Sequence, residues 1–246
     1  MNAIDRCFDT SSIRLTREQK VMSVSSETTA PVLLRKIRSA AYRFKTFVRS
    51  QRFGMSPDAI YDGAFYDGGA FDKTEETARH VVHYLIRTYA PRSVLDIGCG
   101  KGSYLRHFAD AGCLAVGCEG SIEGIRRVPS PATAFQFDLR RPLRLNRRFS
   151  LTMCIEVAEH IPSNASETLV ESVCRHAEDV IVFSAAPPSE SGTDHINCRP
   201  KEFWHGLFLR QGWRPNIEET AQLCAFSRAE GLPQWWREWT HVYRKQ

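Results

Sequence analysis

The sequence predicts an α/β fold, in which a mostly parallel sheet is covered by helices on both faces. Its 246 residues suit one large domain better than two small ones. With 42% hydrophobic and 25% charged residues, the composition is that of a globular protein, which excludes fibrous and fully disordered classes. Short apolar runs alternate with helical stretches from residue 93 to residue 211, and this alternation is typical of a parallel sheet.

Two segments at the start of the chain lie outside this pattern. Residues 1–30 are polar and without period, so we expect a disordered tail. Residues 31–58 are predicted to be a basic amphipathic helix and linker, because apolar side chains recur there at steps of three and four residues. The chain carries a net charge of +5, and residues 31–56 hold seven Lys or Arg and no acid. The remainder has 26 basic and 28 acidic residues, so the basicity is local.

The basic helix has three interpretations. A helix packed on its own domain with a solvated basic face is the simplest of them. Alternatively, residues 33–52 make peripheral contact with an anionic membrane surface, or they contact the phosphates of a nucleic acid. The chain shows no apolar run of membrane-spanning length and no apolar core of a secretory signal near its start, so we expect a cytoplasmic protein. The eight cysteines contain no C-x-x-C pair, which disfavours zinc fingers and predicts buried free thiols.

Residues 59–246 are predicted to form the α/β domain. A helix is expected to start at Thr74, which two acids follow, and to end before Pro91. The apolar runs that predict strands are 93–97, 114–118, 133–137, 151–155 and 180–183. The stretches that predict the intervening helices are 101–111, 121–127, 164–177 and 200–211. After Gly212, residues 213–218 and 238–244 are expected to close the sheet as an antiparallel pair.

The segment from Ser93 to Phe108 is a hydrophobic strand that runs into a glycine-rich turn and then a helix. Glycines at 98, 100 and 102 allow a sharp turn and a close approach of the backbone to a ligand. The spacing is G-x-G-x-G, whereas the dinucleotide fingerprint G-x-G-x-x-G requires glycine at the position of Ser103.

Three acids follow three successive strands. Asp96 lies at the end of the first strand, where a buried carboxylate needs a partner such as a cationic amino group. Glu119 ends the second strand and is placed to accept both hydroxyls of a ribose. Asp138 ends the third and is placed to accept a bond from an adenine amino group. The carboxyl ends of parallel strands meet at one edge, so these acids predict a nucleotide site there.

These residues resemble the class I S-adenosylmethionine-dependent methyltransferases over roughly residues 60–245, which implies a Rossmann-like, seven-stranded, mostly parallel sheet with an antiparallel last strand. Residues 96–102 resemble the family's first motif, Glu119 its ribose acid, and Asp138 and Leu139 its adenine-contacting pair. The resemblance implies S-adenosylmethionine as cofactor. Its expected contacts are Asp96, Gly98, Cys99, Gly100, Gly102, Glu119, Asp138, Leu139 and Glu156.

The fourth strand leads into Glu156, Glu159 and His160, and a later histidine, His195, follows the fifth strand. We expect Glu156, His160 and His195 to be catalytic, with an imidazole as general base. In the alternative interpretation these residues only orient the loop. A third possibility is a divalent metal held by Glu156, Glu159, His160 and His195, because the pattern resembles that of small-RNA 2′-O-methyltransferases. The expected ion is Mg²⁺, Mn²⁺ or a softer divalent cation.

Residues 61–71 and 183–204 are similar to a bacterial subgroup of these methyltransferases, in which the first segment resembles a lead-in that covers the cofactor. All five tryptophans lie after residue 200, and they either stack on a sugar or base or pack against the sheet. The function we expect is O-methylation of a small molecule or glycan. The alternatives are a metal-assisted 2′-O methyltransferase acting on RNA, and a cofactor-binding protein without catalysis.

Overall fold

The computed structural model describes residues 56–67, 70–190, 192 and 194–246, with only the backbone described for residues 70–73. The predicted tail and nearly all of the basic helix lie outside the described residues, so their assignment stays a prediction. Within the described part, no helix combines the length and the apolar character needed to cross a membrane.

Seven strands form a single sheet with the order β3-β2-β1-β4-β5-β7-β6. The strands are β1 (Ser93–Ile97), β2 (Leu114–Glu119), β3 (Thr133–Gln136), β4 (Phe149–Ile155), β5 (Ala177–Ser184), β6 (Trp213–Pro215) and β7 (His241–Lys245). The first five strands pair in parallel, and β7 runs antiparallel to both of its neighbours. The predicted Rossmann-like sheet with an antiparallel last strand is therefore confirmed.

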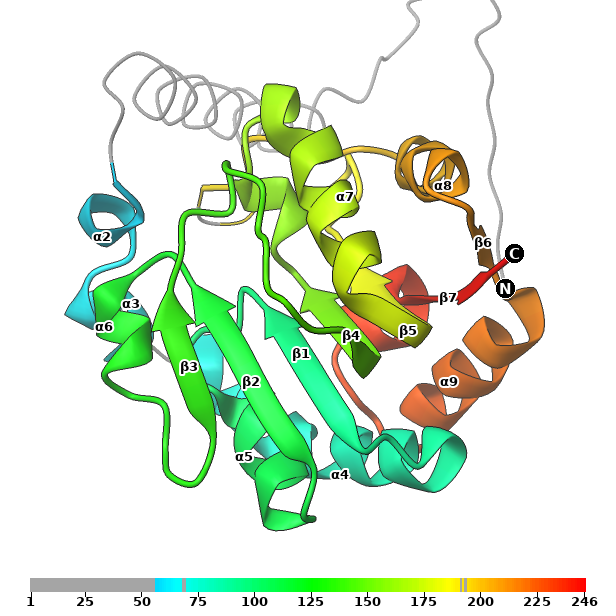
Figure 1. The fold of residues 1–246 in the computed structure, drawn as a ribbon, viewed down its shortest axis with the longest axis horizontal. Coiled ribbons are helices and arrows are strands. Elements are labelled where there is room, and N and C mark those ends of the chain that lie inside the picture. The colour runs from blue at the N-terminus through cyan, green and yellow to red at the C-terminus, as the bar shows by residue number, and fades with distance from the viewer. Residues whose placement is uncertain (1–55, 68–69, 191, 193) are drawn as a thin grey trace, which may run out of the picture. The chain divides into compact units, whose positions relative to one another are not determined.

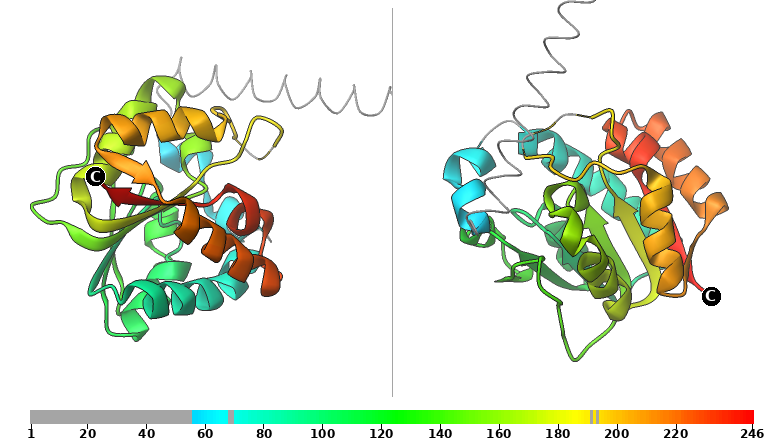
Figure 2. Two further views of the ribbon diagram at one scale, coloured as in Figure 1. Left: turned by 90° about the vertical axis from the view of Figure 1, so that its right-hand side faces the viewer. Right: turned by 90° about the horizontal axis from the view of Figure 1, so that it is seen from above.

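Helices cover both faces of this sheet (Figure 1). The helices are α2 (Pro57–Ile60), α3 (Gly63–Asp67), α4 (Ala70–Tyr89), α5 (Ser103–Asp110), α6 (Ile122–Ile125), α7 (Ser166–His176), α8 (Lys201–Arg210) and α9 (Ile217–Ala229). Two short 3₁₀ turns, η1 (Ala158–His160) and η2 (Ser163–Ala165), and a π-helix, η3 (Trp235–Trp239), complete the described elements. The turned views in Figure 2 show α7 and α8 on one side of the sheet and α4, α5 and α9 on the other.

The strand β5 shows why both layers are needed. Its central residues are fully buried and alternate between two cores, because successive side chains of a strand point to opposite faces. Ile181 and Phe183 join the core beneath α7 and α8. Val180 and Val182 join the core beneath α4, α5 and α9. The seven cysteines in the described part of the chain are free thiols, five of them buried, as predicted.

Two details of the predicted elements are wrong. The helix expected from Thr74 already begins at Ala70, because Thr and Glu are also tolerated inside a helix and mark no unique start. The strand expected over 213–218 ends at Pro215, and α9 follows it. Asn216 caps α9, since its side-chain oxygen accepts the Glu219 amide at 3.0 Å. This N-x-x-E capping signal was present in the sequence and predicts the helix.

Two glycines provide a test of how tightly the layers pack. A Cβ on Gly117 of β2 would lie 2.5 Å from Leu105 Cδ1 and 2.7 Å from Cys99 Sγ. We expect Gly117→Ala to lower the free energy of unfolding by about 1–3 kcal/mol through overpacking. In α8, a Cβ on Gly206 would meet only the end of Arg210, at 4.0 Å.

The matched substitution, Gly206→Ala, should therefore raise the free energy of unfolding by about 0.5–1 kcal/mol, since it removes backbone entropy from the unfolded chain. Urea unfolding of both variants measures the two shifts. Equal shifts for the two variants would contradict the packing described between β2 and α5.

Candidate active site

A cavity of about 480 Å³ lies at the carboxyl ends of the first strands. Eight of the nine residues predicted to bind the cofactor line it: Asp96, Gly98, Cys99, Gly100, Glu119, Asp138, Leu139 and Glu156. Gly102 is the exception, because it precedes α5 with a φ of +78° and its Cα faces Val128. Its role is to turn the chain into the helix rather than to line the cavity.

The first glycine of the turn allows two loops to meet. Gly98 has a φ of +80°, and a Cβ there would lie 2.9 Å from Val157 Cγ1 in the loop after β4. The amides of Gly98 and Cys99 both donate to the Cys118 carbonyl at the end of β2, at 2.8 and 3.0 Å. These hydrogen bonds and the contact with Val157 therefore hold the turn in this conformation.

Asp96 is a buried acid in the wall of the cavity. Its side chain is only 2% exposed, and one carboxylate oxygen has no hydrogen-bond partner among the described residues. Burial, together with the nearby charge of Glu119, raises the pKa of Asp96 to about 7. A buried acid of this kind at the wall of a cavity is suited to a ligand that brings a cationic group.

Glu119 ties together the loops that follow β1 and β2. Its carboxylate accepts the Gly100 amide at 3.0 Å and the Ser121 amide at 2.9 Å. Burial raises the pKa of this carboxyl group, although these hydrogen bonds act to lower it. The predicted ribose contact remains a prediction, but the carboxylate lies in the cavity wall where that contact requires it.

Asp138 already has a partner. The Arg140 guanidinium binds its carboxylate with both Nε and Nη2, at distances between 2.6 and 3.0 Å. This pairing outweighs partial burial and lowers the pKa of Asp138. Arg140 also lines the cavity, although sequence reasoning did not assign it to the site. An adenine amino group that binds Asp138, as predicted, therefore has to share the carboxylate with Arg140 or displace the guanidinium.

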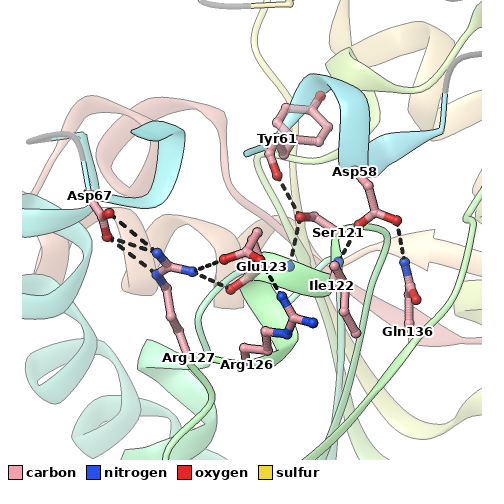
Figure 3. Close-up of polar contacts among 9 residues, drawn as sticks. All are labelled: Asp58, Tyr61, Asp67, Ser121, Ile122, Glu123, Arg126, Arg127 and Gln136. Carbon is pink, nitrogen blue, oxygen red and sulfur yellow. Dashed lines mark hydrogen bonds and ion pairs between the residues drawn. The ribbon is translucent and has the colours of Figure 1, made fainter. Parts of the chain in front are cut away.

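The segment before α4 forms one wall of the cavity, and Figure 3 shows how it is attached. The Ser121 hydroxyl donates to the Tyr61 carbonyl at 2.6 Å. Asp58 accepts from the Ile122 amide and from the side chain of Gln136, the latter at 2.9 Å. Because these bonds join α2 to the loop that follows β2, the lead-in is part of the cofactor cavity.

A second attachment fixes α3 to α6 (Figure 3). Arg127 lies between two acids, at 2.7 Å from Glu123 and 3.2 Å from Asp67. Tyr66, in α3, lines the cavity and forms a hydrogen bond with Glu119. The glycine-aromatic stretch that the sequence singled out therefore contributes aromatic side chains to the site.

Aromatic side chains also come from the far end of the chain. Trp235 and Trp239 in the π-helix η3 line the cavity, whereas Trp204, Trp213 and Trp236 are buried in the cores. The indole of Trp236 donates to the Tyr104 hydroxyl at 2.9 Å, which attaches η3 to α5. The sequence shows the clustering of tryptophans near the C-terminus, but it does not distinguish the two that line the cavity from the three that are buried.

Glu156 stands at the carboxyl end of β4 with a φ of +55°, an uncommon backbone conformation for a residue other than glycine. Its carboxylate accepts the Ser184 hydroxyl from the neighbouring β5 at 2.7 Å. Burial raises the pKa of Glu156 to about 7. The acid that is predicted to be catalytic therefore lies in the cavity with a pKa near neutral pH.

Glu159, His160 and His195 come together beside it. One potential ligand atom from each of these residues lies within 4.8 Å of the other two, and the imidazole centroids are 4.9 Å apart. Both histidines line the cavity. Burial, and then the neighbouring His195, lowers the pKa of His160 to about 3, so this imidazole is neutral at physiological pH. Glu156, the fourth predicted ligand, does not belong to this group.

Backbone hydrogen bonds explain how the distant His195 reaches this position. The amides of Ile196 and Asn197 both donate to the Glu159 carbonyl at 2.9 Å. The buried Asn197 side chain donates to Ser166 at 2.9 Å. The segment around His195 is therefore attached to the turn that carries His160.

The Rossmann-like strand order, the glycine turn after β1 and the acids after three strands define a nucleotide-binding transferase of the class I methyltransferase type. The chain belongs to the methyltransferase domain family, whose model matches residues 71–239. It is an S-adenosylmethionine-dependent methyltransferase, as the sequence predicted.

Individual relatives resemble parts of the chain or its fold. A dTDP-3-amino-3,6-dideoxy-α-D-glucopyranose N,N-dimethyltransferase from Streptomyces fradiae is 36% identical over 75 residues, which is 29% of each chain. The structure is similar to that of DesVI from Streptomyces venezuelae, with a TM-score of 0.57, 19% identity and coverage of 76% of this chain and 98% of that one.

Two further solved structures share the fold. The sugar N-methyltransferase KedS8 from Streptoalloteichus matches with a TM-score of 0.56 and 18% identity, over 74% of this chain and 91% of that one. A magnesium protoporphyrin IX methyltransferase from Synechocystis, with bound SAH, matches with a TM-score of 0.53 and 16% identity, over 86% of this chain and 100% of that one. At these identities the likeness concerns the fold alone.

The raised pKa of Asp96 predicts a pH-dependent affinity for S-adenosylhomocysteine. The ionised carboxylate attracts the ligand's amino group, and the carboxyl group loses its proton as pH rises through about 7. We expect the affinity to increase from about pH 6 to about pH 8, and Asp96→Asn to bind more weakly with a flat profile. Calorimetry measures both profiles, and Asp110→Asn on the exposed face of α5 is the control.

The free energy of unfolding provides a second test of the raised pKa of Asp96. The folded chain holds the proton of the Asp96 carboxyl group more tightly than the unfolded chain does. Asp96 therefore lowers the free energy of unfolding as pH rises from about 4 to about 7. Ligand-free Asp96→Asn should therefore be more stable than the natural chain at about pH 8. An unchanged pH profile of affinity in the folded Asn variant would contradict the assignment of Asp96 to the ligand's cation.

Proposed function

We propose that this methyltransferase acts on a hydroxyl group of a small polar molecule, with sugars as the substrate class. The observation that carries the proposal is one cavity that joins the cofactor acids to the two histidines and to two tryptophans. Aromatic rings pack on the apolar faces of sugars, and imidazoles accept protons from hydroxyl groups. The sugar methyltransferases among the relatives support the substrate class.

The chain's own residues would divide the work as follows. When bound, S-adenosylmethionine supplies a methyl group on its sulfonium sulfur, and this sulfur is the leaving group of the in-line displacement. Asp96 and Glu119 hold the cofactor at its amino group and ribose. Trp235 and Trp239 orient the acceptor, and the imidazole of His195 accepts the proton that the hydroxyl loses, while the less basic His160 packs against it. The enzyme contributes mainly by holding the acceptor oxygen about 3–3.5 Å from the methyl carbon.

A divalent metal fits the residues that lie beside the acceptor. Nδ1 of His160 is buried without a hydrogen-bond partner among the described residues, and the Glu159 carboxyl group beside it is fully buried. Glu159, His160 and His195 would hold the ion, and this donor set favours Mn²⁺ or Zn²⁺ over Mg²⁺, which prefers oxygen. The ion would acidify a bound hydroxyl group. Burial and the nearby Glu156 raise the pKa of the Glu159 carboxyl group.

An amino group is the second candidate acceptor. Names of two relatives specify N-methylation of sugars, and the cavity places the carboxylate of Glu156 near the same end as the histidines. A carboxylate with a pKa of about 7 is suited to take the proton of an ammonium group. The relatives named above give no support to the RNA alternative.

Loss of an imidazole tests the proposed function. We expect His160→Ala and His195→Ala to lower the rate of methyl transfer by about 10²–10⁴-fold, while S-adenosylhomocysteine binds with nearly unchanged affinity. Labelled S-adenosylmethionine and a panel of sugars, each in a hydroxyl and an amino form, serve as substrates. His83→Ala, on the exposed face of α4, is the control. Transfer only to the amino forms would replace the hydroxyl proposal with N-methylation.

Metal binding is tested apart from activity. Calorimetric titration of the ligand-free protein with Mn²⁺ or Zn²⁺ should show one ion per chain. Glu159→Gln should weaken this binding by about 10²-fold or more, because it removes one of three ligands, while Glu156→Gln should retain it. Absence of stoichiometric binding, or equal losses in the two Gln variants, would leave the histidines as proton acceptors alone.

A further inference from the structure

A second charged region lies in the connection between β3 and β4. Residues 140–148 contain five arginines and no acid. The connection starts at the carboxyl edge of the sheet, where Asp138 and Arg140 line the cofactor cavity, and ends at Phe149, the amino end of β4. Figure 1 shows it running from the carboxyl end of β3 to the amino end of β4.

Side chains of α7 hold the backbone of this connection in place. The Leu143 amide donates to the Ser172 hydroxyl at 3.0 Å, and the Leu145 amide donates to Nε2 of His176 at 2.8 Å. His176 is fully buried, and its Nδ1 lies 2.7 Å from the Ser172 carbonyl. Leu143 is buried as well. The arginines therefore project from an anchored loop.

Three of these arginines and one from α7 line a hollow of about 480 Å³, whose lining residues are Arg144, Leu145, Asn146, Arg147, Arg148 and Arg175. Arg175 comes from the last turn of α7 and the others from the loop. Within the described part of the chain, no acid lies within ion-pair distance of these four arginines, in contrast to Arg140. The Arg147 guanidinium is instead held over the Phe149 ring, at 5.5 Å from its centre.

This hollow is separate from the methyl-transfer site. It borders the amino ends of β4 and β5, whereas Glu156 and Ser184 mark their carboxyl ends. Seven residues of β4 span about 20 Å at 3.3 Å per residue. A small acceptor bound near His160 therefore does not reach these arginines.

We propose that the hollow binds the oligophosphate group of a small molecule, such as a nucleoside di- or triphosphate, as a second ligand of the enzyme. Four unpaired guanidinium groups repel one another, and a chain of two or three phosphates supplies a matching negative charge. Guanidinium forks bind phosphate oxygens in pairs, so the anchored loop offers several such bonds at once. The volume lies within the range of small-ligand sites.

A nucleic acid is the main competing occupant, because its backbone offers the same phosphate chemistry. The hollow favours the small ligand, since its cationic side chains converge from two elements on one concave point. A polymer would instead need charges spread along a surface at the spacing of its phosphates. Binding of a strand is therefore treated as an outcome that overturns the proposal.

The experiment uses the full chain saturated with S-adenosylhomocysteine, so that the cofactor cavity is filled. Tripolyphosphate and ATP are titrated by calorimetry, with a poly(U) strand at equal phosphate concentration as the competing probe. The double variant Arg147→Gln with Arg148→Gln removes two charges from the hollow. The control, Arg210→Gln with Arg214→Gln, removes two exposed charges that do not line it.

We expect tripolyphosphate and ATP to bind one per chain, and the hollow variant to bind both at least about tenfold more weakly than the control variant does. Both variants should keep S-adenosylhomocysteine affinity, which shows that they fold. Equal weakening in the two variants would mean diffuse charge attraction and would overturn the proposal. Affinity unchanged in the hollow variant would place the anion elsewhere, for example on residues 31–56, and would overturn it too. Tighter binding of poly(U), lost in the hollow variant, would assign the region to nucleic acid instead.

Discussion

The hydrogen bonds of one buried carboxylate organise the cofactor side of this enzyme. Glu119 accepts amides from Gly100 in the first turn and from Ser121 at the start of α6. Ser121 in turn donates to the Tyr61 carbonyl, so the wall in front of the sheet depends on the same carboxylate. A charged group costs free energy to bury unless such donors compensate it, and here the donors belong to the loops that the site needs. The acid that is expected to bind ribose therefore also shapes the cavity for it.

The direction of the parallel strands separates two kinds of charge. Acids and two histidines collect where the first five strands end, because each loop that leaves the sheet at this edge adds a residue to one cavity. Arginines without an ion-pair partner among the described residues collect at the opposite edge, before β4 and in the last turn of α7. An anionic second ligand at that edge would leave the methyl-transfer site unobstructed. The sheet, α7 and the connection between β3 and β4 would then join the two sites.

The acceptor side depends on backbone bonds more than on local sequence. Glu156 and Asp194 adopt positive φ angles, of +55° and +57°, just where the two loops that carry the histidines meet. Conformations of this kind persist when the surroundings determine them, and they are frequent at functional sites. The Glu159 carbonyl, which receives two amides from the segment after His195, provides that constraint. The two imidazoles are therefore held together by the backbone of the loops that carry them.

The sequence by itself determined the sheet, and it predicted eight residues that line one cavity at the carboxyl ends of the strands. Each of these follows from local patterns: apolar runs predict strands, glycines such as Gly98 predict the turn, and an acid at the end of a strand must lie at its carboxyl edge. Only the tertiary structure decided that Glu159 rather than Glu156 joins the two histidines, that Trp235 and Trp239 face the cavity, and that the arginines before β4 converge with one from α7. These are contacts between residues far apart in the chain, and no period or spacing encodes them. They depend on how two loops or two elements meet across the packed core.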